Sequence, residues 1–147
     1  MAKLSRIAPE IPVSDLHAAI QYYEQKLGFR TVMEMPDRAY AILERDDVAV
    51  HLFRTDTRHY SPVAVHIFTN ELEELHAELQ QRGAGVLQGI VQKPWGNRDF
   101  RVSDGSGNEI KFTEPVSSLD ENNAKGSKGG SDNDTSCRGQ HVSIESV

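Results

Sequence analysis

The residues best suited to chemistry are histidines and aromatic side chains that alternate along two short apolar segments. His51 and Phe53 stand two residues apart in the first segment, as do His66 and Phe68 in the second. Residues two apart share one face of a β-strand. Imidazole can bind a metal or move a proton, and aromatic faces stack on planar heteroaromatic groups. Two interpretations stay open: a ligand-binding surface, or ordinary sheet residues with apolar neighbours and hydrogen-bond partners.

Other catalytic patterns are absent from the sequence. The single cysteine, Cys137, lies in a polar C-terminal stretch, and no Ser, His and Asp spacing indicates a nucleophile. No glycine-rich phosphate loop opens a predicted helix. We therefore predict no catalytic residue. General acid–base pairs leave no sequence signature, so an enzyme without a metal that uses His51 or His66 as its base stays open.

Composition and charge exclude several classes of protein. The chain has 147 residues and a formal net charge of −6, without a dense stripe of lysine and arginine, so we expect no nucleic acid partner. No apolar run approaches the roughly 20 residues of a membrane-spanning helix. Residues 1–6 lack the apolar stretch of a secretory signal. We therefore expect a cytoplasmic protein, in agreement with its single cysteine.

Residues 7–54 are predicted to form one βαβββ unit. An extended apolar stretch over residues 7–13 leads to Ser14 and Asp15, which suit the N-cap of a helix. Apolar residues then recur at helical spacing up to Leu27, and Gly28 is placed to end that helix. Three strands are expected near residues 29–35, 38–45 and 48–54, with turns at 36–37 and 46–47.

Residues 62–114 repeat this pattern. A strand over residues 62–69 leads to Asn70, which is expected to cap a helix in a capping box with Glu73. Gly83 is placed to end that helix. Its buried stripe is predicted to consist of Leu72, Leu75 and Leu79. Strands are expected near residues 84–91, 97–103 and 108–114, with a turn over 104–108.

Together the two units predict an α+β fold in which each helix covers one face of a mostly antiparallel sheet. The other face of each sheet is left for a ligand, a partner subunit or both. We place the units at about residues 4–56 and 60–115, within one domain over residues 1–116. Residues 117–147 are mostly Ser, Gly, Asn, Asp and Lys and are expected to form a disordered tail.

Three stretches resemble the vicinal oxygen chelate superfamily, which includes glyoxalases, bleomycin resistance proteins and dioxygenases. IPVSDL and YYEQKLGF, at residues 11–16 and 22–29, look like its opening strand and capped helix. KPWGNRDF, at 93–100, resembles the PWG-x-R-x-F segment of bleomycin resistance proteins. DGSGNEI, at 104–110, looks like the DPDGN turn, with Gly105 in place of proline. The resemblance covers residues 4 to about 114 and implies duplicated βαβββ modules forming a curled mixed sheet with outer helices, in a dimer with shared grooves.

Enzymes of this superfamily hold a divalent metal with His and Glu side chains at four strand positions. Counting from the helix caps and the final turn, the resemblance carries these positions over to Ala8, His51, Ala64 and Lys111. Alanine has no donor atom and a lysine ammonium has no lone pair. The resemblance therefore implies that the metal site is deleted and that no cofactor is bound. The alternative is a register slip of two residues, which would group Glu10, His51 and His66.

The resemblance also implies a drug groove lined by aromatic residues. Trp95 corresponds to a groove tryptophan at the subunit boundary and could also anchor the dimer, whereas Arg98 is expected to form a structural salt bridge. The predicted ligand-binding residues are Tyr40, His51, Phe53, His66, Phe68, Trp95 and Lys111. The acidic candidates for contacting a cationic drug tail are Glu10, Glu44, Asp46, Asp47 and Asp99.

The expected function is therefore that of a homodimeric binding protein. It would confer resistance by stoichiometric sequestration of a bleomycin-type glycopeptide, including its copper-bound form, and not by turnover. The alternative is a metal-dependent lyase, dioxygenase or thiol transferase with displaced metal ligands. A binding module for another small molecule also stays open, because the same scaffold hosts many functions.

Overall fold

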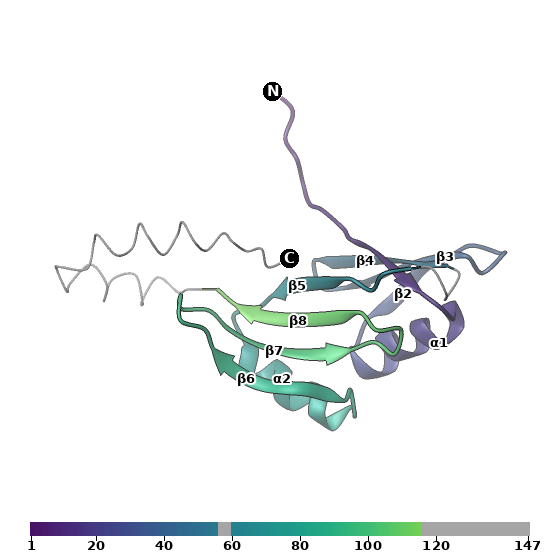
Figure 1. Ribbon diagram of the computed structural model, residues 1–147. Coiled ribbons are helices and arrows are strands. Elements are labelled where there is room, and N and C mark those ends of the chain that lie inside the picture. Colours follow the sequence, from purple (N-terminus) through teal and green to yellow (C-terminus); the bar gives the residue numbers. More distant parts are fainter. Residues whose placement is uncertain (56–59, 116–147) are drawn as a thin grey trace.

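The structure is a computed structural model that describes residues 1–55 and 60–115. Two mixed sheets of four strands have the orders β1-β4-β3-β2 and β5-β8-β7-β6, and each module contributes one sheet (Figure 1). This arrangement confirms the duplicated βαβββ prediction. The tail expected over residues 117–147 lies outside the described residues.

The elements follow the predicted order, with ends that differ by a few residues. The first module contains β1 (Glu10–Val13), α1 (Leu16–Gln21), the π-helix η1 (Tyr22–Lys26), β2 (Arg30–Glu34), β3 (Tyr40–Arg45) and β4 (Val48–Arg54). The second contains β5 (Ala64–Phe68), α2 (Leu72–Gln81), β6 (Val86–Gln92), β7 (Arg98–Ser103) and β8 (Glu109–Glu114). In each module the first strand runs parallel to the last, and the other pairs are antiparallel.

The first helix begins as predicted and changes form halfway. Oδ1 of Asp15 accepts a hydrogen bond of 3.1 Å from the backbone N–H of Ala18, which confirms the cap. The expectation of one α-helix up to Leu27 is wrong, because residues 22–26 form a wider π-helical turn. The N–H of Phe29 reaches back to the carbonyl of Tyr23 at 2.9 Å, and Tyr23 is fully buried.

The capping box expected at the start of α2 does not form. The N-cap is Glu71 and not Asn70, and its side chain makes no capping hydrogen bond. The backbone N–H of Glu71 donates instead to Oγ1 of Thr69 at 3.0 Å. Glu73 is unavailable for the box because its carboxylate pairs with Arg98 at 2.9 Å. A charge-assisted bond to a distant strand has replaced the local cap.

Both strands that open a module are shorter than the sequence predicted. Only residues 10–13 of the expected 7–13 pair with β4, so β1 begins at Glu10. Before it, an arm extends away from the sheets (Figure 1), and Met1, Leu4 and Ile7 on this arm are exposed. Within the described residues, no helix has the length and apolar composition that crossing a membrane requires.

Apolar side chains of both sheets and both helices form one continuous core. It includes the predicted leucine stripe of α2, with Leu72 and Leu79 buried and Leu75 packed at its edge. The turn over residues 104–108 joins the modules, because the Asn108 amide donates to the Pro12 carbonyl at 2.7 Å. The same side chain accepts from the N–H of Val63 at 2.9 Å.

Candidate ligand-binding site

Strand alternation in the first sheet separates a core face from a partly open face. Val50 and Leu52 are fully buried, whereas His51 and Phe53, which alternate with them along β4, are half-buried. Tyr40 of β3 pairs with Phe53, and Glu10 of β1 pairs with His51. Because directly paired residues share a face, the open face carries all four of these side chains.

Glu10, Tyr40 and His51 form a hydrogen-bonded cluster on this face. The Tyr40 hydroxyl lies 2.8 Å from Oε2 of Glu10 and 2.6 Å from Nδ1 of His51. A phenol has one hydrogen, so when it donates to the carboxylate, its oxygen accepts from the Nδ1–H of His51. The lone pair of Nε2 is then available to accept a hydrogen bond. Desolvation and the hydrogen bond to Glu10 raise the pKa of Tyr40 above its usual value.

The second sheet presents a matching face. His66 pairs with Lys111 and Phe68 pairs with Thr113. Nδ1 of His66 lies 2.8 Å from the Thr113 hydroxyl, and the rings of His66 and Phe68 are close to parallel, with centroids 6.1 Å apart. Phe68 is 60% exposed, so most of its ring is open to contact. Desolvation and the charge of Lys111 lower the pKa of His66, which favours its neutral form.

Trp95 lies at the tip of the β6–β7 turn. The N–H of Gly96 donates to the Lys93 carbonyl at 3.0 Å, and Gly96 has a φ of 111°. Trp95 is 51% exposed. The turn adjoins the end of the second sheet at which Phe68 lies, since Phe68, Thr113 and Asp99 pair in one row across that sheet.

The acidic candidates separate into four groups. Glu10 belongs to the cluster with Tyr40, and Glu44 is compensated by Arg6 at 3.2 Å and Arg30 at 3.6 Å. Asp46 and Asp47 line a cavity beside α2. Asp99 is buried, with 3% of its surface exposed. Strand alternation predicts the face of a side chain but not its depth.

Asp99 is one of the polar residues whose burial the sequence did not predict. Its Oδ1 atom has no hydrogen-bond partner in the part of the chain that the structure describes. The nearest cation is Lys93, with Nζ 4.0 Å away. Arg98, next to it in the chain, forms the predicted salt bridge, with Nε 2.8 Å from Oε1 of Glu114.

Of the four positions that the resemblance assigns to a metal, only His51 has a side chain that can bind one. Ala8 and Ala64 offer no donor. Lys111 offers only an ammonium group. In the slipped alternative, Glu10 and His51 belong to one sheet and His66 to the other. Over residues 1–55 and 60–115, no three His, Cys, Asp or Glu side chains are grouped to hold an ion.

Comparison with known proteins gives the family. The family model described as "Glyoxalase/Bleomycin resistance protein/Dioxygenase superfamily" matches residues 3–112. The chain belongs to this superfamily. Its members share the duplicated module seen here and include both binding proteins and enzymes, as the following relatives illustrate.

A bleomycin resistance protein from Geobacillus stearothermophilus is 26% identical over 131 residues, which cover 75% of this chain and 96% of the relative. A bleomycin-binding protein from bleomycin-producing Streptomyces verticillus, solved with copper(II)-bleomycin, has a TM-score of 0.66 and 25% identity, covering 78% of this chain and 99% of that one. A lactoylglutathione lyase from Agrobacterium tumefaciens has a TM-score of 0.63 and 17% identity, covering 77% and 96% of the two chains. At this identity, the similarity to the lyase shows only that the two chains share a fold.

Proposed function

We propose that the protein binds a bleomycin-type glycopeptide antibiotic and confers resistance by holding it stoichiometrically. The observation that carries this proposal is the pair of exposed aromatic side chains, Phe68 and Trp95, at one end of the second sheet. Exposed rings of this size are suited to stack on planar heteroaromatic groups. The similarity to bleomycin resistance and bleomycin-binding proteins supports this ligand class.

The polar groups beside these rings can fix the orientation of a bound ligand. The imidazole of His66 and the ammonium of Lys111 can hydrogen-bond amide oxygens of a peptide ligand. Glu10 can accept from a cationic group, and the free Nε2 of His51 can accept from an N–H. Phe53 and Tyr40 extend the aromatic surface of the first sheet. These groups bind and orient a ligand, and none of them requires turnover.

The proposed site is shared between two copies of the chain. In a homodimer, the first-sheet face of one copy would lie opposite the second-sheet face of its partner, which forms two equivalent grooves. Some large apolar side chains are exposed and would be available to such an interface. They include Met1, Leu4, Ile7, Phe68, Leu87 and Trp95.

Calorimetric titration with copper-loaded bleomycin, after a metal analysis of the purified protein, tests this function. We expect saturation near one drug per subunit and a sub-micromolar Kd. Trp95→Ala should weaken binding by at least roughly tenfold, which corresponds to about 1.4 kcal/mol. Leu87→Ala, which removes another exposed apolar side chain, serves as the matched control. An absence of binding heat together with a stoichiometric divalent ion would overturn the proposal and favour a metal-dependent enzyme.

A further inference from the structure

A cavity lies on the helix side of the molecule, and Phe68 of the proposed drug-binding surface is among the residues that line it. It has a volume of about 400 Å³ and lies between the turn that joins β3 to β4 and the N-terminal half of α2. Ile67 and Phe112, which line it, alternate with His66 and Lys111 and so point to the opposite faces of their strands. A cavity of this volume can hold a small organic molecule.

The floor of the cavity is apolar. It consists of Phe29, Val48, Ile67, Leu75 and Phe112, which come from both modules. Phe29 and Phe112 are almost fully buried, and the other three are partly buried, so the floor is the open margin of the common core. A ligand with an aromatic or aliphatic body would cover this margin and remove apolar surface from water.

The rim of the cavity is acidic. Five carboxylates line it against one guanidinium, that of Arg45, which is a formal charge of −4. The acidic residues are Asp46, Asp47, Glu71, Glu74 and Glu78. The positive end of the α2 dipole offsets roughly half a charge and leaves the rim strongly negative.

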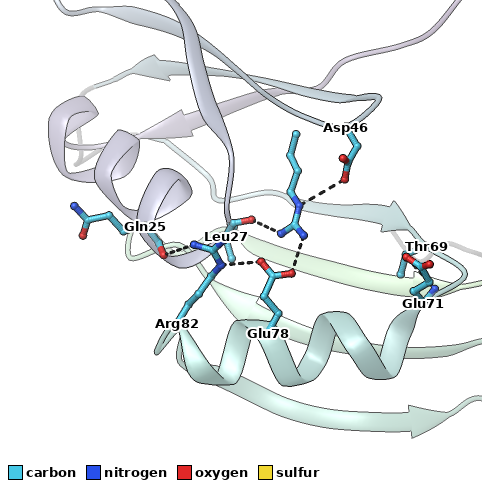
Figure 2. A network of polar contacts seen from close by, with 8 residues as sticks. Gln25, Leu27, Asp46, Thr69, Glu71, Glu78 and Arg82 are labelled. Carbon is cyan, nitrogen blue, oxygen red and sulfur yellow. Dashed lines mark hydrogen bonds and ion pairs between the residues drawn. The ribbon is translucent and has the colours of Figure 1, made fainter.

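The guanidinium groups near the cavity are already engaged. Arg45 donates to the Leu27 carbonyl and to Oε1 of Glu78, both at 2.8 Å, and Arg82 donates to Oε2 of Glu78 at 2.7 Å. Figure 2 shows this network, with Asp46 on the turn above and Thr69 and Glu71 set apart at the start of α2. Nε of Arg45 also lies 3.6 Å from Oδ2 of Asp46. Within the described residues, the network therefore engages Glu78 and Asp46 and leaves the other three carboxylates of the rim uncompensated.

Three carboxylates remain for a ligand. Among the described residues, Asp47, Glu71 and Glu74 have no ion-pair partner. Their negative charge stands above an apolar floor, which is the complement of a cation attached to an apolar body. We propose that this cavity binds a small organic cation, an ammonium or guanidinium group carried on an aromatic or aliphatic body. The cavity shares Phe68 with the proposed antibiotic-binding surface, but its acidic rim does not enter that proposal.

The test is a titration of the ¹⁵N-labelled full chain with 4-phenylbutylamine, followed by amide NMR at low salt. 4-Phenylbutan-1-ol is the neutral probe of matched shape. We expect saturable shifts at Val48, Thr69 and Glu74, roughly tenfold weaker binding of the alcohol, and weaker binding of the amine as salt is added. Equal binding of amine and alcohol would overturn the proposal.

Single substitutions test which carboxylates of the rim contribute to amine binding. Asp47→Asn and Glu74→Gln should each weaken the amine about threefold. Glu34→Gln removes the same charge from the exposed strand β2, outside the cavity lining, and should leave the affinity unchanged. Shifts confined to the face of His51, His66 and Trp95 would overturn the proposal. A second copy of the chain that covers the cavity would also overturn it. This outcome would be detected as shifts at Thr69 and Glu74 that depend on protein concentration and do not respond to the amine. Amine binding that persists at saturating copper-bleomycin separates this site from the antibiotic site.

Discussion

The Tyr23 hydroxyl donates a hydrogen bond of 3.1 Å to Oδ2 of Asp104, 81 positions further along the chain. Both residues are buried. Asp104 also accepts from the backbone N–H of Ser106 at 2.9 Å and from the Asn108 amide at 2.8 Å. One carboxylate therefore shapes the final turn of the second module and binds the helical segment of the first.

Tyr23→Phe should test this junction with little change in packing. The ring keeps its edge contact with Phe29, whose centroid lies 5.9 Å away, and the carboxylate loses one buried donor. We expect the free energy of unfolding to fall by about 1–3 kcal/mol, measured by urea denaturation. Tyr40→Phe removes a hydroxyl from the open strand face and should cost less than about 0.5 kcal/mol. Equal effects of the two variants would contradict a special role for the buried bond.

Glu78 should make stability depend on pH in the acidic range. Its hydrogen bond to Arg45 is the main cause that lowers its pKa below the usual value. A carboxylate with a lower pKa in the folded state adds stability above its unfolded pKa and loses it as the pH falls through the folded value. Wild-type stability should therefore fall below about pH 5 more steeply than that of Glu78→Gln, by at most about 1 kcal/mol because the pair is partly exposed. Parallel curves from urea denaturation at several pH values would contradict this.

The pKa of His66 should depend on the charge of Lys111. Desolvation and this ammonium group lower the pKa of His66, so Lys111→Met should move the pKa upward toward the ordinary histidine value. The measurement is a ¹H NMR titration of the imidazole Cε1 proton. Lys26→Met, which removes a lysine from η1 in the other module, should leave the titration of His66 in place.

Gly28→Ala should destabilise the junction between the modules. Gly28 has a φ of +78°, and an added Cβ would lie 2.9 Å from Nη1 of Arg45, the group that donates to the Leu27 carbonyl. Strain in the left-handed region alone costs about 1–2 kcal/mol. Gly89→Ala is the matched control, because nothing lies within 4 Å of its Cβ position. It should change the free energy of unfolding by less than about 0.5 kcal/mol.

Features that depend on neighbouring residues were predictable from the sequence. The alternation of His51 and Phe53 with buried residues, the Asp15 cap and the leucine stripe of α2 all depend on short-range spacing. The capping box failed because Glu73 is paired with Arg98, which lies 25 positions away along the chain. The depth of Asp99 was missed for the same kind of reason, since neighbouring strands and the β6–β7 turn decide it.

The sequence by itself determined the duplicated module, the open face of each sheet and the residue types on those faces, because side-chain period and capping act over a few positions. Only the tertiary structure decided that Tyr40 joins Glu10 to His51 and that Tyr23 meets Asp104. It also decided that the acidic turn after β3 closes a cavity with α2. These contacts join residues far apart in the chain, and their geometry depends on how two sheets and two helices pack around one core.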